Sequence, residues 1–359
     1  MRICLSMIVK NEAAVIERCL RSVKPHVHAW AIADTGSDDG TQDIIRRYMA
    51  DLPGEIIERP WVDFATNRNQ ALDLARNHGD YALIIDADEV LESDAGFRWG
   101  ALGEPGYMLE FVYGPSRYHR TALPRLDAGW RWEGVLHEAL VRPQMAEVPI
   151  LPGLRIHVHS DGVRSRLPLA EKFARDAEVL RRALESEPGN TRHAFYLAQS
   201  LRDAGQWHEA IAAYERRALM GGWDEEVYYC RLQAALLKER TGAAYADVVV
   251  AYLDAIDHSP LRAEALCDFA RYLRQHKRYA LARQFAQAAT RMQQPPGVLI
   301  LDSTVYAWRA RDELAVACYL SGDRSESARL WSELLAEQRL PAAERERVQR
   351  NFAVAVAGI

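Results

Sequence analysis

The chain has 359 residues, 49% of them hydrophobic and 26% charged, a composition typical of a globular protein with room for two domains. Its net charge of −5 gives no support to nucleic-acid binding, which normally needs a basic surface. Because the five cysteines are scattered without close pairs, and because no apolar run has the length of a signal peptide or a membrane span, we expect a cytoplasmic protein without a zinc site or disulfide framework.

The first predicted elements form a βαβ unit. Residues 2–9 are an apolar run of strand length, and a second such run covers residues 27–33. Between them, apolar residues at helical spacing predict a helix that includes Ile16 and Leu20. A strand, a helix and a strand in this order predict a parallel sheet.

A polar segment, residues 34–41, follows the second run. It supplies turn-forming glycines and candidate caps for a helix through Tyr48, namely Gly36, Gly40, Ser37, Asp38 and Thr41. An ordinary loop rich in capping residues is one interpretation. The other is a nucleotide site, because a carboxylate at a strand end, here Asp34, can accept hydrogen bonds from ribose hydroxyls or a base edge.

A short third strand over residues 55–58 and a helix over residues 64–77 come next. Arg68 and Asn69 lie in the first turns of this helix, from which their side chains could reach the mouth of the sheet. Arg68 there would neutralise a phosphate or pair with a strand-end acid. A solvated surface arginine is the alternative.

The next apolar run, residues 81–85, ends in Asp86-Ala87-Asp88-Glu89. Such a run predicts a buried strand, and open α/β sheets bind their ligands at the carboxyl ends of the strands. Mg²⁺ and Mn²⁺ take carboxylate, phosphate and water oxygens, so Asp86 and Asp88 are candidate metal-site residues. Capping of a turn by these aspartates is the competing interpretation.

Four ordered blocks carry a resemblance: residues 6–12 (Ser-Met-Ile-Val-Lys-Asn-Glu), residues 34–41, Arg68-Asn69 and residues 86–89. Together they resemble family 2 glycosyltransferases of the GT-A fold, in particular a bacterial subgroup with lipopolysaccharide-core transferases and peptide S-glycosyltransferases. The resemblance covers the amino-terminal half and implies a GT-A domain over residues 1–165.

The resemblance also implies site residues. Three would line the nucleotide-base pocket: Met7, Val9 and Glu12. Asp34 matches the acid that contacts base or ribose, Arg68 matches a residue that braces the diphosphate side, and Asp86 matches the acid near ribose and sugar. Asp88 matches the direct ligand of a Mn²⁺ or Mg²⁺ ion that would stabilise the departing nucleoside diphosphate. The implied donor is a UDP-sugar.

The stretch Trp130 to Glu138 resembles an aromatic-rich stretch of the subgroup that ends in His-Glu. Direct displacement with inversion needs a base for the acceptor proton, and Glu138, next to His137, is the candidate. The Glu-Asp pair that supplies the base in many family members has no clear counterpart here. Asp127 and Glu133 therefore stay open as the base, and a structural surface pair of His137 and Glu138 is the alternative.

Residues 156–159 (Ile-His-Val-His) predict a strand with both histidines on one face. In the family a late histidine often completes the metal shell, so His159 or His157 is a candidate ligand, and an imidazole ligand would favour Mn²⁺. The match is loose, because this histidine is usually followed by an aromatic residue and a glycine, whereas Ser-Asp-Gly follows His159 here.

From residue 166 onward the pattern becomes helical, and small residues recur in triplets with the same internal gaps. The first three triplets are offset from one another by 36 residues, close to the roughly 34 of a tetratricopeptide repeat. The triplets are Ala198, Ala210, Tyr214; Ala234, Ala246, Val250; Ala270, Ala282, Ala286; and, more weakly after an insertion at residues 295–297, Val316, Ala328, Ser332. Residues 345–356 predict a capping helix.

These patterns predict an α/β GT-A domain followed by an all-α tetratricopeptide-like solenoid over residues 166–359. The expected function is metal-dependent, inverting transfer of a sugar from a nucleotide-diphosphate donor to a saccharide, peptide or other acceptor. The solenoid would bind the acceptor or a protein partner, mediate self-association, or only support the catalytic half. The rival prediction is an inactive scaffold that binds a protein partner.

Overall fold

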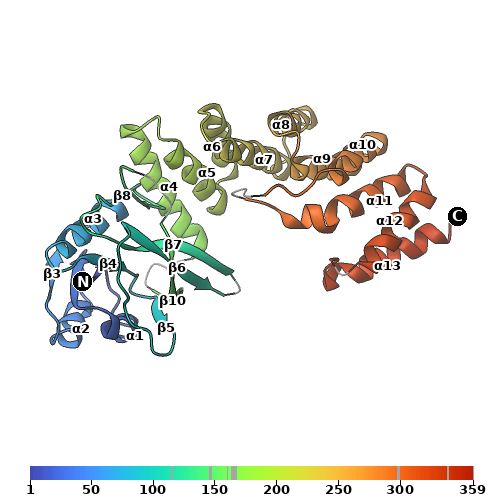
Figure 1. The fold of residues 1–359 in the computed structure, drawn as a ribbon. Helices are drawn as coiled ribbons and strands as arrows, with labels where there is room; N and C mark the ends of the chain where they lie inside the picture. The colour runs from blue at the N-terminus through green and yellow to red at the C-terminus, as the bar shows by residue number, and fades with distance from the viewer. Residues whose placement is uncertain are drawn as a thin grey trace. The chain divides into compact units, whose positions relative to one another are not determined.

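The computed structural model describes residues 1–114, 116–144, 148–159, 161–162, 168–296, 300–337 and 339–358. The chain divides into two compact units, Met1–Pro188 and Gly189–Ile359; in Figure 1 the first runs from blue to light green and the second continues to red. The predicted domain boundary at residues 165 and 166 lies outside the described residues. Helix α4 (Leu169–Ser186) belongs to the first unit.

The first unit is built on a four-stranded parallel sheet in the order β3-β2-β1-β4. Its strands and the helices between them are β1 (Ile3–Val9), α1 (Ile16–Val23), β2 (Ala29–Asp34), α2 (Thr41–Tyr48), β3 (Gly54–Glu58), α3 (Phe64–Ala75) and β4 (Tyr81–Ile84), with a 3₁₀ turn η1 (Lys24–His26) before β2. The predicted βαβ unit, third strand and fourth strand are thus confirmed.

Both faces of this sheet are covered, because successive side chains on a strand point to opposite sides. Leu5 and Met7 of β1 pack with Ile16 and Leu20 of α1 in one core cluster. Cys4 packs on the opposite face in a second cluster, formed with α3 and with Trp130 and Trp132. The sheet therefore forms the middle layer between helices.

A second, mixed sheet continues the first unit in the order β5-β10-β6-β7. It consists of β5 (Val90–Ser93), β6 (Gly106–Tyr113), β7 (Ser116–Pro124) and β10 (Ile150–His157), and a separate hairpin-like pair is formed by β8 (Arg131–Glu133) and β9 (Ala139–Val141). Phe111 and Ile156 of this sheet are buried in the same cluster as β1 and α1. The two sheets therefore share a core.

The second unit consists of helices packed in sequence. They are α5 (Thr191–Asp203), α6 (Trp207–Leu219), α7 (Asp224–Arg240), α8 (Tyr245–His258), α9 (Ala263–Gln275), α10 (Tyr279–Thr290), α11 (Ala310–Leu320), α12 (Arg324–Ala336) and α13 (Ala342–Val356), with a π-type turn η3 (Val305–Arg309) before α11. Each helix packs against the next along the chain. The unit is a tetratricopeptide-like solenoid, and α13 ends it as the predicted terminal helix.

The fixed repeat offset is wrong in two of the four helix pairs. In the second pair the predicted Ala246 is exposed and Val250 is 56% exposed, whereas Val248 and Tyr252 are fully buried. α7 runs one residue further beyond Ala234 than α5 does beyond Ala198, and the turn before α8 is one residue longer than the turn before α6, so the buried positions of α8 move two residues along the chain. In the fourth pair Ser332 is exposed and Trp331 is buried instead. Gly297 of the predicted insertion lies outside the described residues.

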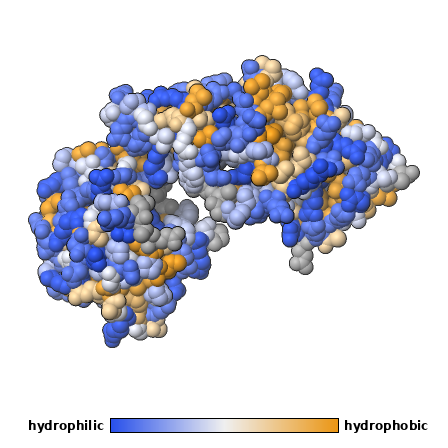
Figure 2. Space-filling view, turned by 45° about the horizontal axis from the view of Figure 1, so that its top comes forward, coloured by the Kyte–Doolittle hydropathy of each residue, from blue (hydrophilic) through white to orange (hydrophobic). Residues whose placement is uncertain are grey.

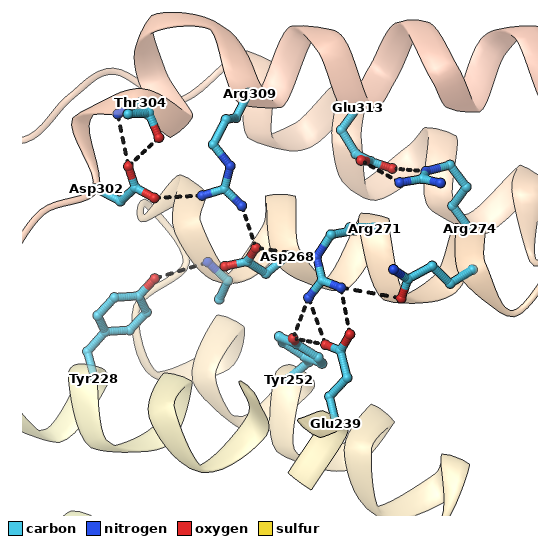
Figure 3. A network of polar contacts seen from close by, with 12 residues as sticks. Tyr228, Glu239, Tyr252, Asp268, Arg271, Arg274, Asp302, Thr304, Arg309 and Glu313 are labelled. Atoms are coloured by element: carbon cyan, nitrogen blue, oxygen red, sulfur yellow. Dashed lines mark hydrogen bonds and ion pairs between the residues drawn. The ribbon is translucent and has the colours of Figure 1, made fainter. Parts of the chain in front are cut away.

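Arginine–carboxylate contacts join alternate helices of this unit. Arg271 of α9 contacts Glu239 of α7 at 2.5 Å, and Arg274 of α9 pairs with Glu313 of α11. Figure 3 shows both contacts, together with Arg309, which lies between Asp302 and Asp268. We call this set of contacts, with that of Arg347 and Asp312 (2.8 Å) between α13 and α11, the arginine ladder.

The surface of the helical unit also carries exposed apolar side chains. Val250 and Leu253 on α8 are exposed, as are Leu219 at the end of α6 and Leu261 in the turn before α9. Orange areas on this unit in Figure 2 interrupt the mostly hydrophilic surface. Within the part of the chain that the structure describes, no helix is long and apolar enough to cross a membrane.

Candidate functional site

The candidate site lies at the carboxyl ends of β1, β2 and β4. The chain moves from β1 outward to β3 and then returns to place β4 on the other side of β1, so the strand order reverses beside β1. In open α/β sheets, ligands bind outside the carboxyl ends of the strands at such a reversal. Asp34 ends β2, and Asp86 and Asp88 follow β4.

Asp34 is fully buried, and only one of its two carboxylate oxygens accepts hydrogen bonds from described residues. Its Oδ1 accepts hydrogen bonds from the backbone N–H groups of Gly36 and Ser37, both at 2.9 Å. Its Oδ2 is buried and has no hydrogen-bond partner among the described residues. A carboxylate oxygen in that state needs a donor, so Asp34 retains the capacity to accept a hydroxyl or N–H of a ligand.

Most of the polar residues after Asp34 bind the turn that follows β1. Ser37 Oγ accepts from Asn11 N–H at 2.9 Å, and Thr41 Oγ1 accepts from Glu12 N–H at 2.8 Å. The prediction that Ser37, Asp38 or Thr41 caps α2 is wrong. The N-cap is Gly40, with φ of 89°, and its position receives no side-chain cap. These residues join two loops of the site instead.

The three residues expected near the base differ in their surroundings. Met7 and Val9 are 1% and 2% exposed and belong to the hydrophobic core, which gives their side chains a packing role. Glu12 lies at the site itself, because a Cβ placed on Gly162 would be 3.3 Å from its carboxylate and 2.9 Å from that of Asp88. Contact of these residues with a nucleotide stays a prediction.

Arg68 binds two carboxylates at once. Its Nη1 lies 2.8 Å from Asp86 Oδ1, and its Nε donates to Glu138 Oε1 at 2.7 Å. The guanidinium also lies over the ring of Trp132, 5.1 Å from its centroid. The structure thus places Arg68, Asp86 and Glu138 together, although they are far apart in sequence. Arg68 pairs with a strand-end acid, one of the two roles considered for it.

The charges around Asp86 and Asp88 are unevenly balanced. Burial acts to raise the pKa of Asp86, but the adjacent Arg68 lowers it below its ordinary value. Burial and the charge of Asp86 raise the pKa of Asp88, which is stabilised by a hydrogen bond from Gly162 N–H at 3.3 Å. Among the described residues, the carboxylate of Asp88 forms no ion pair, although Arg18 donates to its backbone carbonyl at 2.9 Å. A carboxylate without an ion-pair partner, next to a second carboxylate, favours a bound metal ion.

Glu89 is a third carboxyl group at the site, and it is almost completely buried. It is 4% exposed, and its Oε2 accepts from the backbone N–H of Asp86 at 2.9 Å. Burial, and then the charge of Asp86, raise its pKa to about 8. At neutral pH Glu89 is mainly protonated, so it supports the Asp86 backbone without adding a full charge to the site.

The two histidines lie in different environments. β10 ends at His157, so the predicted strand does not include His159. His157 pairs with Glu92 of β5. His159 is exposed and near Asp161, whose pKa is lowered mainly by its hydrogen bonds with Arg18 and to a smaller extent by His159. Metal ligation by either histidine stays a prediction.

The residues present fit a hard divalent ion that is only partly enclosed by protein. Among the described residues, no group of three or more His, Cys, Asp or Glu is arranged to hold a metal. Asp88 and Glu12, which both lie beside Gly162, supply carboxylate oxygens. Mg²⁺ and Mn²⁺ are commonly held by one or two carboxylates and completed by substrate phosphates and water, and this donor set suits that arrangement.

Of the two alternative bases, Asp127 lies near the amino end of β4, whereas the candidate site lies at the carboxyl ends of the strands. The backbone N–H of the preceding Leu126 bonds to the carbonyl of Asp80, just before the start of β4, and Asp127 itself pairs with Arg125. Glu133 is exposed on β8 and pairs with Arg131. Glu138 is the carboxylate of the three that contacts the site, through Arg68. His137, next to it, is exposed, with φ of 52°.

Three site residues were not identified from sequence. Arg18 on α1 binds Asp161 through both terminal nitrogens and donates to the carbonyl of Asp88 at 2.9 Å. Glu89 and Arg120 both lie beside Asp86. Glu89 directly follows the acidic motif, which is a usable signal. Arg18 and Arg120 carry none, because their places depend on how distant elements pack.

The fold and the arrangement of acids at the strand ends define the class: an α/β domain of the GT-A type followed by tetratricopeptide-like helical repeats. Residues 4–95 match the family model described as Glycosyl transferase family 2. The amino-terminal unit therefore carries a family 2 glycosyltransferase domain.

Curated relatives match different parts of the chain. The glycosyltransferase SunS of Bacillus subtilis is 26% identical over 224 residues, 58% of this chain and 51% of that protein. An uncharacterised glycosyltransferase of Rickettsia felis is 36% identical over 93 residues, 26% of this chain and 31% of that protein. A TPR repeat-containing protein of Synechococcus elongatus is 39% identical over 95 residues, 26% of this chain and 22% of that protein. The matches thus span about half or less of these relatives.

Two of the solved structures similar to the chain each match about half of it. BtubC from P. vanneervenii has a TM-score of 0.42 at 16% identity, covering 55% of this chain and 84% of that one. YrrB, described as a TPR protein with an unusual peptide-binding site, has a TM-score of 0.36 at 12% identity, covering 52% of this chain and 84% of that one.

Proposed function

We propose that the protein is a metal-dependent, inverting glycosyltransferase that transfers a sugar from a nucleotide-diphosphate donor, a UDP-sugar, to a saccharide, peptide or other acceptor. The family 2 domain over residues 4–95 supports glycosyl transfer in general. The observation that carries the finer proposal is the poorly neutralised carboxylate of Asp88, beside Asp86 at the carboxyl end of β4.

Asp88 would hold a Mn²⁺ or Mg²⁺ ion, with Glu12 and His159 as further candidates. Such an ion, when bound, neutralises charge on the diphosphate as it leaves. Asp34 would orient the nucleoside through its buried Oδ2, which lacks a hydrogen-bond partner. Asp86, fixed by Arg68 at 2.8 Å, would orient the ribose or the sugar.

Glu138 would accept the proton of the acceptor group during the displacement. Its Oε1 is bound by Arg68 Nε at 2.7 Å, which fixes the orientation of the carboxylate. Its other oxygen would then be the one that takes the proton. The helical repeats would bind the acceptor, a partner protein or a second copy of the chain.

The test is a screen of nucleotide sugars for divalent-metal-dependent hydrolysis and transfer by the parent and by Asp88→Ala. We expect turnover of at least one donor by the parent with Mn²⁺, its loss with chelator, and its loss in Asp88→Ala. Asp127→Ala is the matched control, because it removes a carboxylate near the amino end of β4, the end of the strand opposite to the candidate site. Metal-dependent turnover of no nucleotide sugar by the parent would favour the inactive scaffold that binds a protein partner.

A further inference from the structure

Arg120 on β7 lies on an apolar surface inside the first unit. Its guanidinium carbon is 4.3 Å from the centroid of the Phe111 ring, and Phe111 is fully buried in the core shared by the two sheets. The Arg120 side chain is half-buried, and its Nε is buried. The ring face attracts a cation, but this contact is weaker than the hydration that a half-buried guanidinium loses, so Arg120 keeps the capacity to bind a further partner.

The hydrogen-bonding groups of Arg120 are not used within the described part of the chain. Its Nε is buried without a hydrogen-bond partner, and no described residue forms an ion pair or hydrogen bond with its guanidinium. Arg68, in contrast, already donates to Asp86 and Glu138. Of these two arginines, Arg120 has the greater free capacity to bind an anion.

Arg120 lies close to the candidate site. Tyr81 at the start of β4 forms an antiparallel bridge with Arg125, directly after β7, so β7 runs back along β4 and brings Arg120 toward the carboxyl end of that strand. In agreement, the charge of Arg120 opposes the effect of burial on the pKa of both Asp86 and Glu89. Beside it Tyr118 stacks on Phe111, with ring centroids 5.5 Å apart, and is 43% exposed. The surface next to Arg120 is thus open to a ligand from the side of β7.

We propose that Arg120 binds the diphosphate of the nucleotide donor, and that Arg68 acts as a positioning residue for Asp86 and Glu138. This proposal rests on the proposed glycosyltransferase function. The guanidinium fork matches phosphate oxygens in a bidentate geometry. A diphosphate brought beside Asp86 and Asp88 also needs a cation in addition to a metal ion, and Arg120 supplies one that forms no ion pair or hydrogen bond with another described residue.

The experiment measures binding of UDP, GDP, CDP and dTDP, and of the matching nucleosides, to the full chain in the presence of Mn²⁺ by calorimetry or ligand-observed NMR. We expect Arg120→Gln to weaken binding of the preferred diphosphate by about tenfold or more, the loss typical of a hydrogen bond to a charged group. Binding of the nucleoside should be unchanged. Arg120→Lys should be intermediate, because it keeps the charge without the planar fork.

Arg117→Gln is the matched control. It removes the same charge from the same strand, but Arg117 is exposed and pairs with Glu110 at 3.2 Å, so diphosphate binding should stay at the parent level. Near-ultraviolet circular dichroism and thermal melting of all variants report whether they are folded.

Parent-level binding of the diphosphate by Arg120→Gln would overturn the proposal and leave the proposed function intact. Equal weakening for nucleoside and diphosphate would also overturn it, because Arg120 would then support the site rather than contact phosphate. A parent that binds none of the four diphosphates would overturn the proposed function and this proposal together.

Discussion

Arg68 shows how a single side chain can organise a site from distant parts of the chain. It comes from α3, whereas Asp86 follows β4 and Glu138 precedes β9. With 11% of the Arg68 side chain exposed, its contacts at 2.7 and 2.8 Å are shielded from solvent. Removing either acid would leave a largely buried charge less well paired, which is costly. Substitutions that retain an oxygen at these positions are therefore the informative ones.

Glu138→Gln keeps such an oxygen but removes the proton acceptor. We expect donor binding at the parent level, because the amide oxygen still accepts from Arg68, and transfer lower by about 10²- to 10⁴-fold, the usual contribution of a general base. Donor binding is measured by calorimetry and transfer by product formation. Glu133→Gln on the neighbouring strand is the control; if it abolishes transfer and Glu138→Gln does not, Glu133 is the base.

Glu89 predicts a pH dependence of stability. Its pKa is raised from 4.5 to about 8 in the folded protein, so the folded state keeps a proton that the unfolded chain releases. The resulting stabilisation is complete below about pH 4.5 and is lost as the pH rises toward about 8, by at most about 1.4 kcal/mol per pH unit. Glu89→Gln, which stays neutral, should remove this loss.

The measurement is thermal melting of the chelator-treated parent and variant at about pH 5.5 and about pH 8. Glu89→Gln should gain stability relative to the parent as the pH rises. Glu104→Gln, an exposed position in the same unit, controls for the change of charge. A constant difference between Glu89→Gln and the parent across this range would contradict the raised pKa.

At the scale of elements, β3 is attached to the sheet through a position that only glycine fits. Gly54 lies opposite Trp30 of β2, and a Cβ at this position would overlap the Trp30 ring and its carbonyl oxygen. The residue is required for close approach of two backbones, not for an unusual backbone angle.

Gly54→Ala should therefore disturb the pairing of β2 and β3. Overpacking of this kind costs about 1–3 kcal/mol, which corresponds to a melting temperature lower by roughly 3–10 °C. Gly100→Ala is the control, because a Cβ there meets no atom within 4 Å. Equal melting temperatures for the two variants would show that the sheet accommodates the methyl group.

The elements could largely be predicted from sequence, because strands such as β1 and helices such as α1 are formed by apolar patterns in consecutive residues. The contacts between them could not. Nothing in the spacing of Ser37 and Thr41 indicates that they bind the turn after β1, or that Arg120 approaches Asp86. The repeat offset was wrong for a related reason: the sequence predicted the average spacing, but it did not indicate the extra residue at the end of α7 or the extra residue in the turn before α8.

At the scale of the molecule, the residue at which the first unit ends can be tested. The resemblance predicts a domain of residues 1–165, whereas α4 lies within the first compact unit, which ends at Pro188. α4 buries Ala177, Leu180 and Leu184. A fragment that lacks α4 would lose this burial, at about 25 cal/mol per Å² of apolar surface returned to water.

We therefore expect a fragment of residues 1–188 to melt cooperatively and to bind the preferred nucleoside diphosphate as the full chain does. A fragment of residues 1–165 should melt at a lower temperature or aggregate. Circular dichroism and calorimetry of the two fragments provide the measurement. Equal behaviour of both would place the functional boundary before α4.

The arginine ladder has a consequence for how the helical unit comes apart. In a linear array each repeat is held only by its neighbours, so the terminal helices fray before the middle ones. In this unit, ion pairs such as Arg271 with Glu239 and Arg347 with Asp312 provide part of the attraction between neighbouring repeats. Dissolved ions weaken the more exposed of these links first, and the ionic strength of the medium therefore sets how many helices detach from the carboxyl end before the rest unravel.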